Sequence, residues 1–199
     1  MLYPINLELK DIEITIIGGG DVAYRKCKNF LYFGKAVKVV SNKFIEEFYK
    51  LKDKIEMIED VYKEDYIRNS FIVVAATNNK EINERIGICC RKSGKLVNVV
   101  DDIELSNYTV PSYVKRGDLL ISISTGGKSP SLSSKIKKEL EEKYDDSYEE
   151  YINTLGELRK EIIKNYEDIS VRKKMLNGLL NLTLEELGLL RNKYWIINL

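Results

Sequence analysis

Three consecutive glycines between an apolar segment and a helical segment constrain this 199-residue chain more than any other feature. Residues 12–17 are β-rich and apolar, and the chain then reads Gly18-Gly19-Gly20-Asp21-Val22-Ala23, which matches G-x-G-x-x-A. In this pattern the first glycine permits a tight turn, the second lets a pyrophosphate approach the backbone, and the alanine lets helix and strand pack closely. The segment therefore predicts a strand–turn–helix unit that binds a dinucleotide.

The glycine turn and the start of the following helix supply the predicted phosphate contacts. A helix N-terminus carries unpaired N–H groups and roughly half a positive charge, which favours an anion there. We therefore expect Gly18, Gly20, Asp21 and Val22 to bind the cofactor. The alternative is a glycine-rich turn that binds nothing. A strand before the turn and a further strand after the helix make that alternative weaker.

Apolar strands alternate with helices through the first half of the chain. The predicted strands are residues 12–17, 36–40, 55–58, 71–76 and 96–100, and the predicted helices are residues 21–33 and 80–92. Strands that are apolar throughout and are joined by helices are typical of a parallel sheet covered on both faces. The predicted fold class is α/β, beginning with a Rossmann-type parallel sheet.

The pattern changes after residue 107. Residues 108–114 and 119–124 predict two strands joined by a hairpin-type turn. Ser129-Pro130 predicts the start of a helix that runs to about residue 144, with serine as N-cap and proline at the first helical position. The sequence thus predicts a small hairpin-and-helix segment after the Rossmann sheet.

The remainder of the chain is predicted to be helical from Ser147 onward. Capping boxes are predicted at Ser147 with Glu150 and at Thr183 with Glu186. We expect three segments. They are a nucleotide-binding Rossmann domain at 1–107, a dimerisation and substrate-loop segment at 108–146, and a C-terminal helical domain at 147–199.

Composition excludes several classes of function. The chain has no histidine, so mechanisms that need imidazole as a base or metal ligand are removed, and we expect no metal site. Its 32 basic and 31 acidic residues nearly cancel, which gives no electrostatic case for nucleic acid or an acidic membrane. No apolar run approaches the ~20 residues of a membrane span. Three cysteines without C-x-x-C spacing suit buried thiols in a reducing compartment, so a cytoplasmic location is expected.

The second strand ends without the acidic residue that normally binds the ribose 2′-hydroxyl of NAD about 20 positions after the glycines. Ser41, Asn42 and Lys43 occupy that place. Ser41 or Asn42 could hydrogen-bond a ribose hydroxyl, and Lys43 could meet the 2′-phosphate of NADP. An ordinary polar loop is the alternative for each of them. We expect NAD as the cofactor, with the preference between NAD and NADP left open.

Two further strand ends carry candidate functional residues, because ligands bind outside the carboxyl ends of the strands in such a sheet. The fourth strand ends at Thr77 and Asn78. At least one of them is expected to cap the next helix, and Thr77 is a candidate cofactor contact. The fifth strand ends at Asp101, which is either a loop carboxylate or a catalytic group.

Six segments in register give the chain a family resemblance. It resembles the precorrin-2 dehydrogenases, a family that includes the N-terminal half of bacterial siroheme synthase, over roughly residues 1–140. The matching segments are Tyr3-Pro4-Ile5-Asn6-Leu7, the glycine turn with Arg25-Lys26, Ala75-Ala76-Thr77-Asn78, Asn98-Val99-Val100-Asp101, Pro111-Ser112 and residues 124–130.

The resemblance implies NAD-dependent oxidation of precorrin-2 to sirohydrochlorin, on the route to siroheme or haem. It places the catalytic aspartate at Asp101, which closes the N-V-V-D motif. An aspartate there suits the chemistry, since the oxidation also releases a proton and no histidine competes as base. The resemblance also implies a homodimer, with residues 108–144 as the natural interface.

A polar loop precedes the predicted helix at Ser129. Ser124, Thr125, Gly126 and Lys128 offer hydroxyls, backbone N–H groups and an ammonium, which would suit a substrate with eight carboxylates. Equally, the glycines could serve only as a hinge before the helix.

Two other functions compete with the dehydrogenase. One is a regulatory module that senses NAD(H), and the other is a bifunctional dehydrogenase and ferrochelatase.

Overall fold

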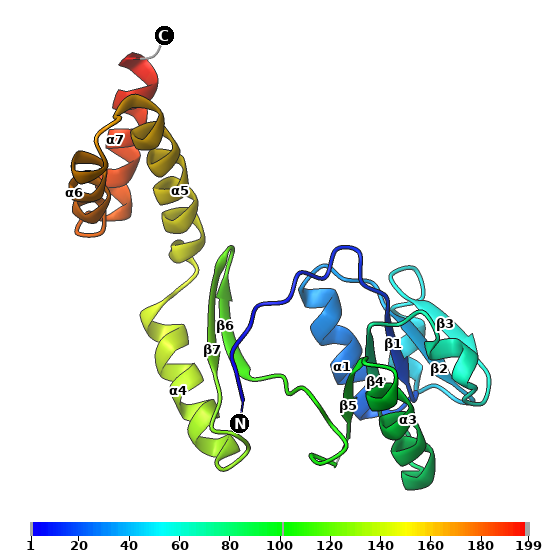
Figure 1. The fold of residues 1–199 in the computed structure, drawn as a ribbon. Coiled ribbons are helices and arrows are strands. Elements are labelled where there is room, and N and C mark those ends of the chain that lie inside the picture. Colours follow the sequence, from blue (N-terminus) through cyan, green and yellow to red (C-terminus); the bar gives the residue numbers. More distant parts are fainter. Residues whose placement is uncertain (1, 101, 198–199) are drawn as a thin grey trace. The chain divides into compact units, whose positions relative to one another are not determined.

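The computed structural model describes residues 2–100 and 102–197 of the chain (Figure 1). The chain divides into two compact units, Met1–Val110 and Pro111–Leu199, which are described separately. The predicted division at 107 and 146 into three segments stays a prediction. Within the described residues, the longest helices are too polar, and the more apolar ones too short, to span a bilayer.

The first unit is built on a five-stranded parallel sheet with strand order β3-β2-β1-β4-β5. The strands are β1 (Ile14–Ile17), β2 (Lys38–Ser41), β3 (Glu56–Glu59), β4 (Ile72–Ala75) and β5 (Leu96–Val99). This order confirms the predicted Rossmann-type sheet. The chain runs outward in opposite directions from β1 and β4, so their carboxyl ends flank the topological switch point where ligands bind.

Alternate side chains of β1 enter two separate hydrophobic cores, one on each face of the sheet. Ile16 packs with Ala23 of α1 in the first core. Ile17 packs with Ile86 of α3 in the second. The two helices are α1 (Asp21–Tyr32) and α3 (Lys80–Lys92), and Figure 1 shows them flanking the sheet. The apolar strands are thus covered on both sides, as the sequence predicts.

Two of the three cysteines are buried members of these cores. Cys27 and Cys90 are fully buried, and Cys89 is partly exposed. Burial raises the pKa of Cys27 to about 11 and that of Cys90 to about 12. Both groups therefore stay protonated at neutral pH, as expected for thiols that serve only as small apolar side chains.

Some elements of the first unit differ from the prediction. A short helix, α2 (Glu46–Tyr49), and a 3-10 turn, η1 (Glu64–Ile67), are additional to the predicted elements. The strand predicted at residues 108–114 is wrong in its first half, because β6 begins only at Ser112. Tyr108 instead packs against the α1-side core.

The second unit begins with an antiparallel hairpin and continues as helices. The hairpin pairs β6 (Ser112–Arg116) with β7 (Leu119–Ile123). The helices are α4 (Pro130–Lys143), α5 (Ser147–Asn165), α6 (Ile169–Leu179) and α7 (Leu184–Ile197). Leu158, Ile162, Leu179 and Leu187 form the core shared by the last three helices. The hairpin and the helical remainder thus match the predicted fold class.

The helix starts in this unit test the predicted caps. The capping box at Thr183 and Glu186 is confirmed, since Thr183 N donates to the Glu186 carboxylate and Glu186 N donates to Thr183 Oγ1. The box at Ser147 and Glu150 is wrong. Ser147 is the first residue inside α5, because Asp145 Oδ1 accepts hydrogen bonds from both its N–H and its hydroxyl. A stronger acceptor two residues earlier therefore moves the helix start by one residue.

Candidate functional site

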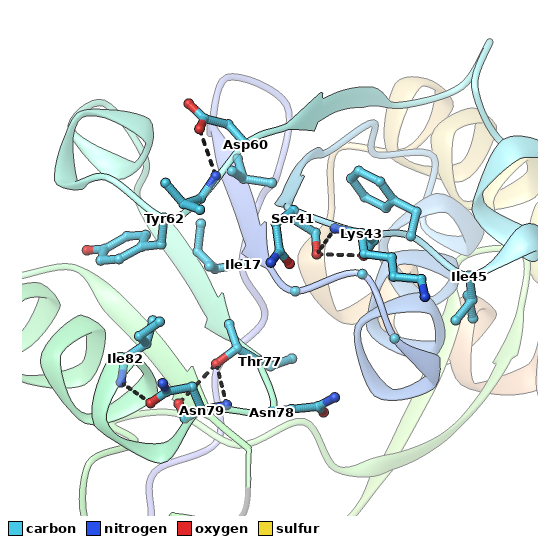
Figure 2. Close-up of a pocket in the computed structure, with 18 of the residues that line it drawn as sticks. Ile17, Ser41, Lys43, Ile45, Asp60, Tyr62, Thr77, Asn78, Asn79 and Ile82 are labelled. Atoms are coloured by element: carbon cyan, nitrogen blue, oxygen red, sulfur yellow. Dashed lines mark hydrogen bonds between the residues drawn. The ribbon is translucent and has the colours of Figure 1, made fainter.

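A cavity of about 870 Å³ opens at the carboxyl ends of β1, β2, β3 and β4 in the first unit (Figure 2). It lies at the switch point where the fold predicts a ligand. Four segments from different parts of the chain line it. They are Gly18–Gly20, Ser41–Glu46, Asp60–Tyr62 and Ala76–Asn79, with Ile17, Val40 and Ile82 between them.

The first two glycines of the turn are required by close backbone packing. Gly18 has a φ of +130°, and a Cβ there would lie 2.2 Å from the carbonyl oxygen of Ala76. A Cβ on Gly19 would lie 2.2 Å from the carbonyl oxygen of Lys43. Backbone hydrogen bonds hold the turn in place. Gly18 N donates to Val40 O and Ile45 N to Gly19 O, each at 2.9 Å, and Ala76 N donates to Ile17 O at 2.8 Å. The turn is thus pinned against β2 and β4.

The third glycine leaves the start of α1 open. Gly20 is the N-cap, so it offers no side chain to the helix, and a Cβ built on it meets no atom within 4 Å. The first backbone bond of the helix runs from Tyr24 N to Gly20 O at 2.9 Å. The N–H groups of Asp21, Val22 and Ala23 therefore have no acceptor within the helix. Together with the helix dipole they form an anion-binding site with open space beside it.

The loop after β2 brings Ser41, Asn42 and Lys43 to the cavity wall, as expected for cofactor candidates. The Ser41 hydroxyl is turned back into the loop. It donates to Lys43 O at 2.8 Å and accepts from Lys43 N at 3.4 Å. Asn42 and Lys43 are exposed, so their side chains are the ones available to a ligand from this loop.

The turn after β4 is held by a buried asparagine that the sequence reasoning missed. Asn83 lies in α3, and its Oδ1 accepts from Thr77 N at 3.1 Å while its Nδ2 donates to Thr77 O at 3.0 Å. Thr77 Oγ1 also lies 2.7 Å from Asn83 Oδ1. The hydroxyl of Thr77 is thus committed to bracing its own turn. The available signal was a polar residue on the apolar face of α3, beside Ile82 and Ile86.

The predicted cap of α3 needs correction. Neither Thr77 nor Asn78 is the N-cap. Asn79 holds that position, and its Oδ1 accepts from Ile82 N at 3.1 Å. Figure 2 shows the Asn78 side chain directed away from Thr77 and Asn79, and it is exposed in the cavity wall. Asn78 is therefore a further candidate contact for a ligand.

The end of β3 contributes a carboxylate that the sequence reasoning also missed. Asp60 lines the cavity and accepts hydrogen bonds from Val61 N at 2.7 Å, from Lys63 Nζ at 2.5 Å and from the Tyr66 hydroxyl. The Lys63 hydrogen bond, with that from Tyr66, lowers the pKa of Asp60 to about 2. The strand-end rule that selected Thr77 would have found Asp60 had it been applied to β3.

The predicted catalytic residue, Asp101, lies outside the described residues. The strand that leads to it, β5, makes an unexpected contact with α1. Lys26 Nζ donates to Asn98 Oδ1 at 2.8 Å, which joins two of the sequence segments that carry the family resemblance. Burial, with the nearby Arg25, lowers the pKa of Lys26.

The predicted substrate loop lies in the second unit and is braced from within. Thr125 Oγ1 donates to Ser129 O at 3.2 Å and accepts from Ser129 N at 3.1 Å. Gly126 N donates to Ser124 Oγ at 3.2 Å, and Gly126 has a φ of +61°. Lys128 is exposed. The loop thus contains a glycine in the left-handed conformation, as a hinge would, and the ammonium of Lys128 is accessible to a ligand.

Comparison with known proteins bears directly on this arrangement. Residues 5–112 match the family model described as putative NAD(P)-binding, and residues 116–143 match the one described as sirohaem biosynthesis protein central. The chain is 33% identical over 160 residues to a precorrin-2 dehydrogenase of Priestia megaterium, an alignment that covers 79% of each protein. The chain belongs to the precorrin-2 dehydrogenase family.

Other members of the family extend the comparison. The solved structure of SirC, a precorrin-2 dehydrogenase, superposes with a TM-score of 0.78 at 31% identity and covers 97% of this chain and 100% of that one. A siroheme synthase of Nitrosomonas eutropha is 30% identical over 183 residues, which are 88% of this chain and 38% of the synthase. The chain therefore spans nearly all of a dehydrogenase in this family and less than half of a siroheme synthase.

Proposed function

We propose that this protein oxidises precorrin-2 to sirohydrochlorin with NAD. The observation that carries the proposal is the open N-terminus of α1, which faces a cavity at the switch point of the sheet. Such a site suits the pyrophosphate of a dinucleotide. Membership of the precorrin-2 dehydrogenase family then supplies the class of substrate.

The cofactor contacts follow from the cavity wall. Gly18 and Gly20 line the cavity beside the proposed pyrophosphate site. The donors are the N–H groups of Asp21 and Val22 in the first turn of α1, which are not themselves lining residues. Asn42 binds the ribose hydroxyls through its exposed side chain, and Lys43 lies next to it in the cavity wall with an exposed ammonium. Ser41 and Thr77 contribute chiefly by shaping the turns that carry them, because their hydroxyls are already bonded within the protein.

The reaction needs a hydride acceptor and a base. Bound NAD supplies the hydride acceptor. Asp101 is proposed to take the proton that the tetrapyrrole releases, since it follows β5, whose carboxyl end lies beside that of β4. The chain has no histidine to take that role instead. Ser124, Thr125, Gly126 and Lys128 are proposed to form the substrate loop, with the Ser124 hydroxyl and the exposed ammonium of Lys128 binding carboxylates of the substrate. Thr125 and Gly126 contribute by shaping the turn, because the Thr125 hydroxyl and the Gly126 N–H already donate within the loop.

We also propose that the protein is a cytoplasmic homodimer joined through residues 108–144. Support comes from the hairpin, since β6 and β7 pair only with each other among the described strands. A two-stranded sheet is marginally stable alone and is stabilised when further strands or helices pack on it, which a second copy can supply. Leu120 is exposed on this hairpin. We expect light scattering to report a dimer for the natural chain and a shift towards monomer for Leu120→Lys. An equally dimeric variant would contradict this interface.

The enzymatic proposal is tested by supplying precorrin-2 and NAD to the purified protein and following NADH and sirohydrochlorin. The natural chain should form both in equal amounts. Asp101→Asn, which keeps the size of the side chain but removes its basicity, should abolish turnover while NAD still binds. Glu104→Gln is a matched control, because Glu104 is an exposed carboxylate that follows Asp101 closely in the sequence. Full activity in Asp101→Asn would contradict the catalytic assignment, and absence of turnover in the natural chain would contradict the function.

A further inference from the structure

We propose that Lys43 binds the 2′-phosphate of NADP, so that the enzyme accepts NADP as well as NAD. The inference rests on the proposed function, since it concerns the same cofactor cavity. It starts from a position that lacks its usual residue. An acidic side chain at the end of β2 normally binds the ribose 2′-hydroxyl and repels a phosphate there. In this chain that strand ends at Ser41, followed by Asn42 and Lys43.

The Ser41 hydroxyl cannot replace the missing carboxylate in selecting NAD. It donates to Lys43 O at 2.8 Å, so its one proton is already used inside the loop. The same bond folds the loop back towards the glycine turn, where Lys43 O is the atom nearest to a Cβ built on Gly19. The backbone of Lys43 is thus fixed against the turn that binds the pyrophosphate.

The Lys43 side chain is free to meet an anion. It is exposed in the cavity wall, and Figure 2 shows it extending from the loop with its ammonium at the free end. Among the described residues its ammonium has no ion-pair partner. Such an ammonium binds a phosphate through a charge-assisted hydrogen bond, and the exposed amide of Asn42 can donate to the same phosphate.

Two acidic groups line the cavity, and their charges determine how far the cofactor preference shifts from NAD towards NADP. Asp60 has its carboxylate occupied by Val61 N, Lys63 and Tyr66, so a basic partner already balances its charge. Glu46 in the first turn of α2 is exposed and unpaired among the described residues. It opposes a phosphate, so we infer that the cavity accepts both cofactors rather than NADP alone.

The test compares the binding of NAD and NADP to the full chain by calorimetry. The natural chain should bind NADP with a Kd within about tenfold of that for NAD. Lys43→Ala should weaken NADP by about tenfold or more while NAD changes by less than about threefold, because one charge-assisted contact is lost. Lys43→Arg should retain NADP binding. Higher salt should weaken NADP more than NAD, since the contact is exposed.

Two control variants sharpen the result. Lys52→Ala removes an exposed lysine that does not line the cavity, and it should leave both affinities unchanged. Glu46→Gln should strengthen NADP selectively. The inference is overturned if NADP binds more than about a hundredfold more weakly than NAD to the natural chain. It is also overturned if Lys43→Ala weakens both cofactors equally, which would place the ammonium on the pyrophosphate. Failure of NAD itself to bind would instead contradict the proposed function.

Discussion

Two glycine-rich loops in this protein lead into helices, and they treat the helix start in opposite ways. The turn at Gly18–Gly20 enters α1 through a glycine N-cap, with no side chain bonded to the first turn. The loop at Gly126 and Gly127 enters α4 through Ser129, whose hydroxyl accepts from Leu132 N at 3.3 Å, and proline takes the first helical position. The first helix start is open, while the second is satisfied by its own residues.

The comparison shows that glycine content alone does not make a phosphate site. An anion needs donors that the protein leaves unpaired, and α4 has used one donor and removed another by proline. The glycines also differ in what holds them. Gly18 lies against the backbone of Ala76, just after β4, and Gly19 against that of Lys43, in the loop after β2. A Cβ on Gly126, in contrast, would meet no atom within 4 Å. The first turn has no room for a side chain at Gly18 or Gly19, whereas the second has room for one at Gly126.

The largest expected effect comes from adding a side chain where the open turn has room for one. Gly20→Val should fold, because Gly20 has an extended φ of −94° and its added Cβ meets no protein atom. The unfolding free energy should fall by at most about 1 kcal/mol, since valine is a poorer N-cap than glycine. NAD affinity should fall by at least about tenfold, because the branched side chain fills the space beside the free N–H groups. Calorimetry and urea unfolding measure the two effects.

The matched control for that variant is Gly126→Ala in the other loop. It should leave NAD affinity unchanged and cost about 1 kcal/mol of stability, because alanine must adopt the left-handed φ of +61°. Substitution of Gly18 would be less informative, since the clash with Ala76 O disturbs the fold itself. Undiminished NAD binding by Gly20→Val would contradict the assignment of the open turn.

A smaller effect is expected from removing the cap of α4. Ser129→Ala should lower the free energy of unfolding by about 1 kcal/mol, because Leu132 N loses its acceptor. NAD affinity should not change. Ser131→Ala, at an exposed position in the same helix turn, is the matched control and should cost less. Loss of NAD binding in Ser129→Ala would show that the two loops are not functionally distinct.

Elements with strong local signals were predictable from the sequence. The helix predicted at residues 80–92 has the observed bounds of α3, because Asn79 caps its start and Gly94 adopts a φ of +68° just beyond its end. The five sheet strands were found within two residues, and the signal is strongest for β1 and β4, which are apolar or buried at every position. At the sheet edge β3 has only Met57 and Ile58 as apolar residues, and both are partly buried. The first half of the strand predicted from residue 108 failed because Tyr108 packs on the core without pairing.

The candidate site was only partly predictable. The glycine turn and the Ser41–Lys43 loop carry sequence patterns tied to phosphate and ribose, so both were found and both line the cavity. Asn83 and Asp60 were missed although each carries a local signal, a polar residue on the apolar face of α3 and an acidic residue directly after β3. The sequence could not show which hydroxyls are already bonded, since Ser41 donates to Lys43 O and Thr77 donates to Asn83 Oδ1. Those bonds depend on how each loop folds, which the residue pattern alone does not determine.

A crystal structure of the protein with bound NAD tests the central claim most directly. The account predicts pyrophosphate oxygens at about 3 Å from the backbone nitrogens of the first turn of α1, beside Gly20. It also predicts that the nicotinamide end extends past Asn78 towards the carboxyl ends of β4 and β5. Phosphate density at the Gly126 loop instead, or a glycine turn left empty at saturating NAD, would contradict it.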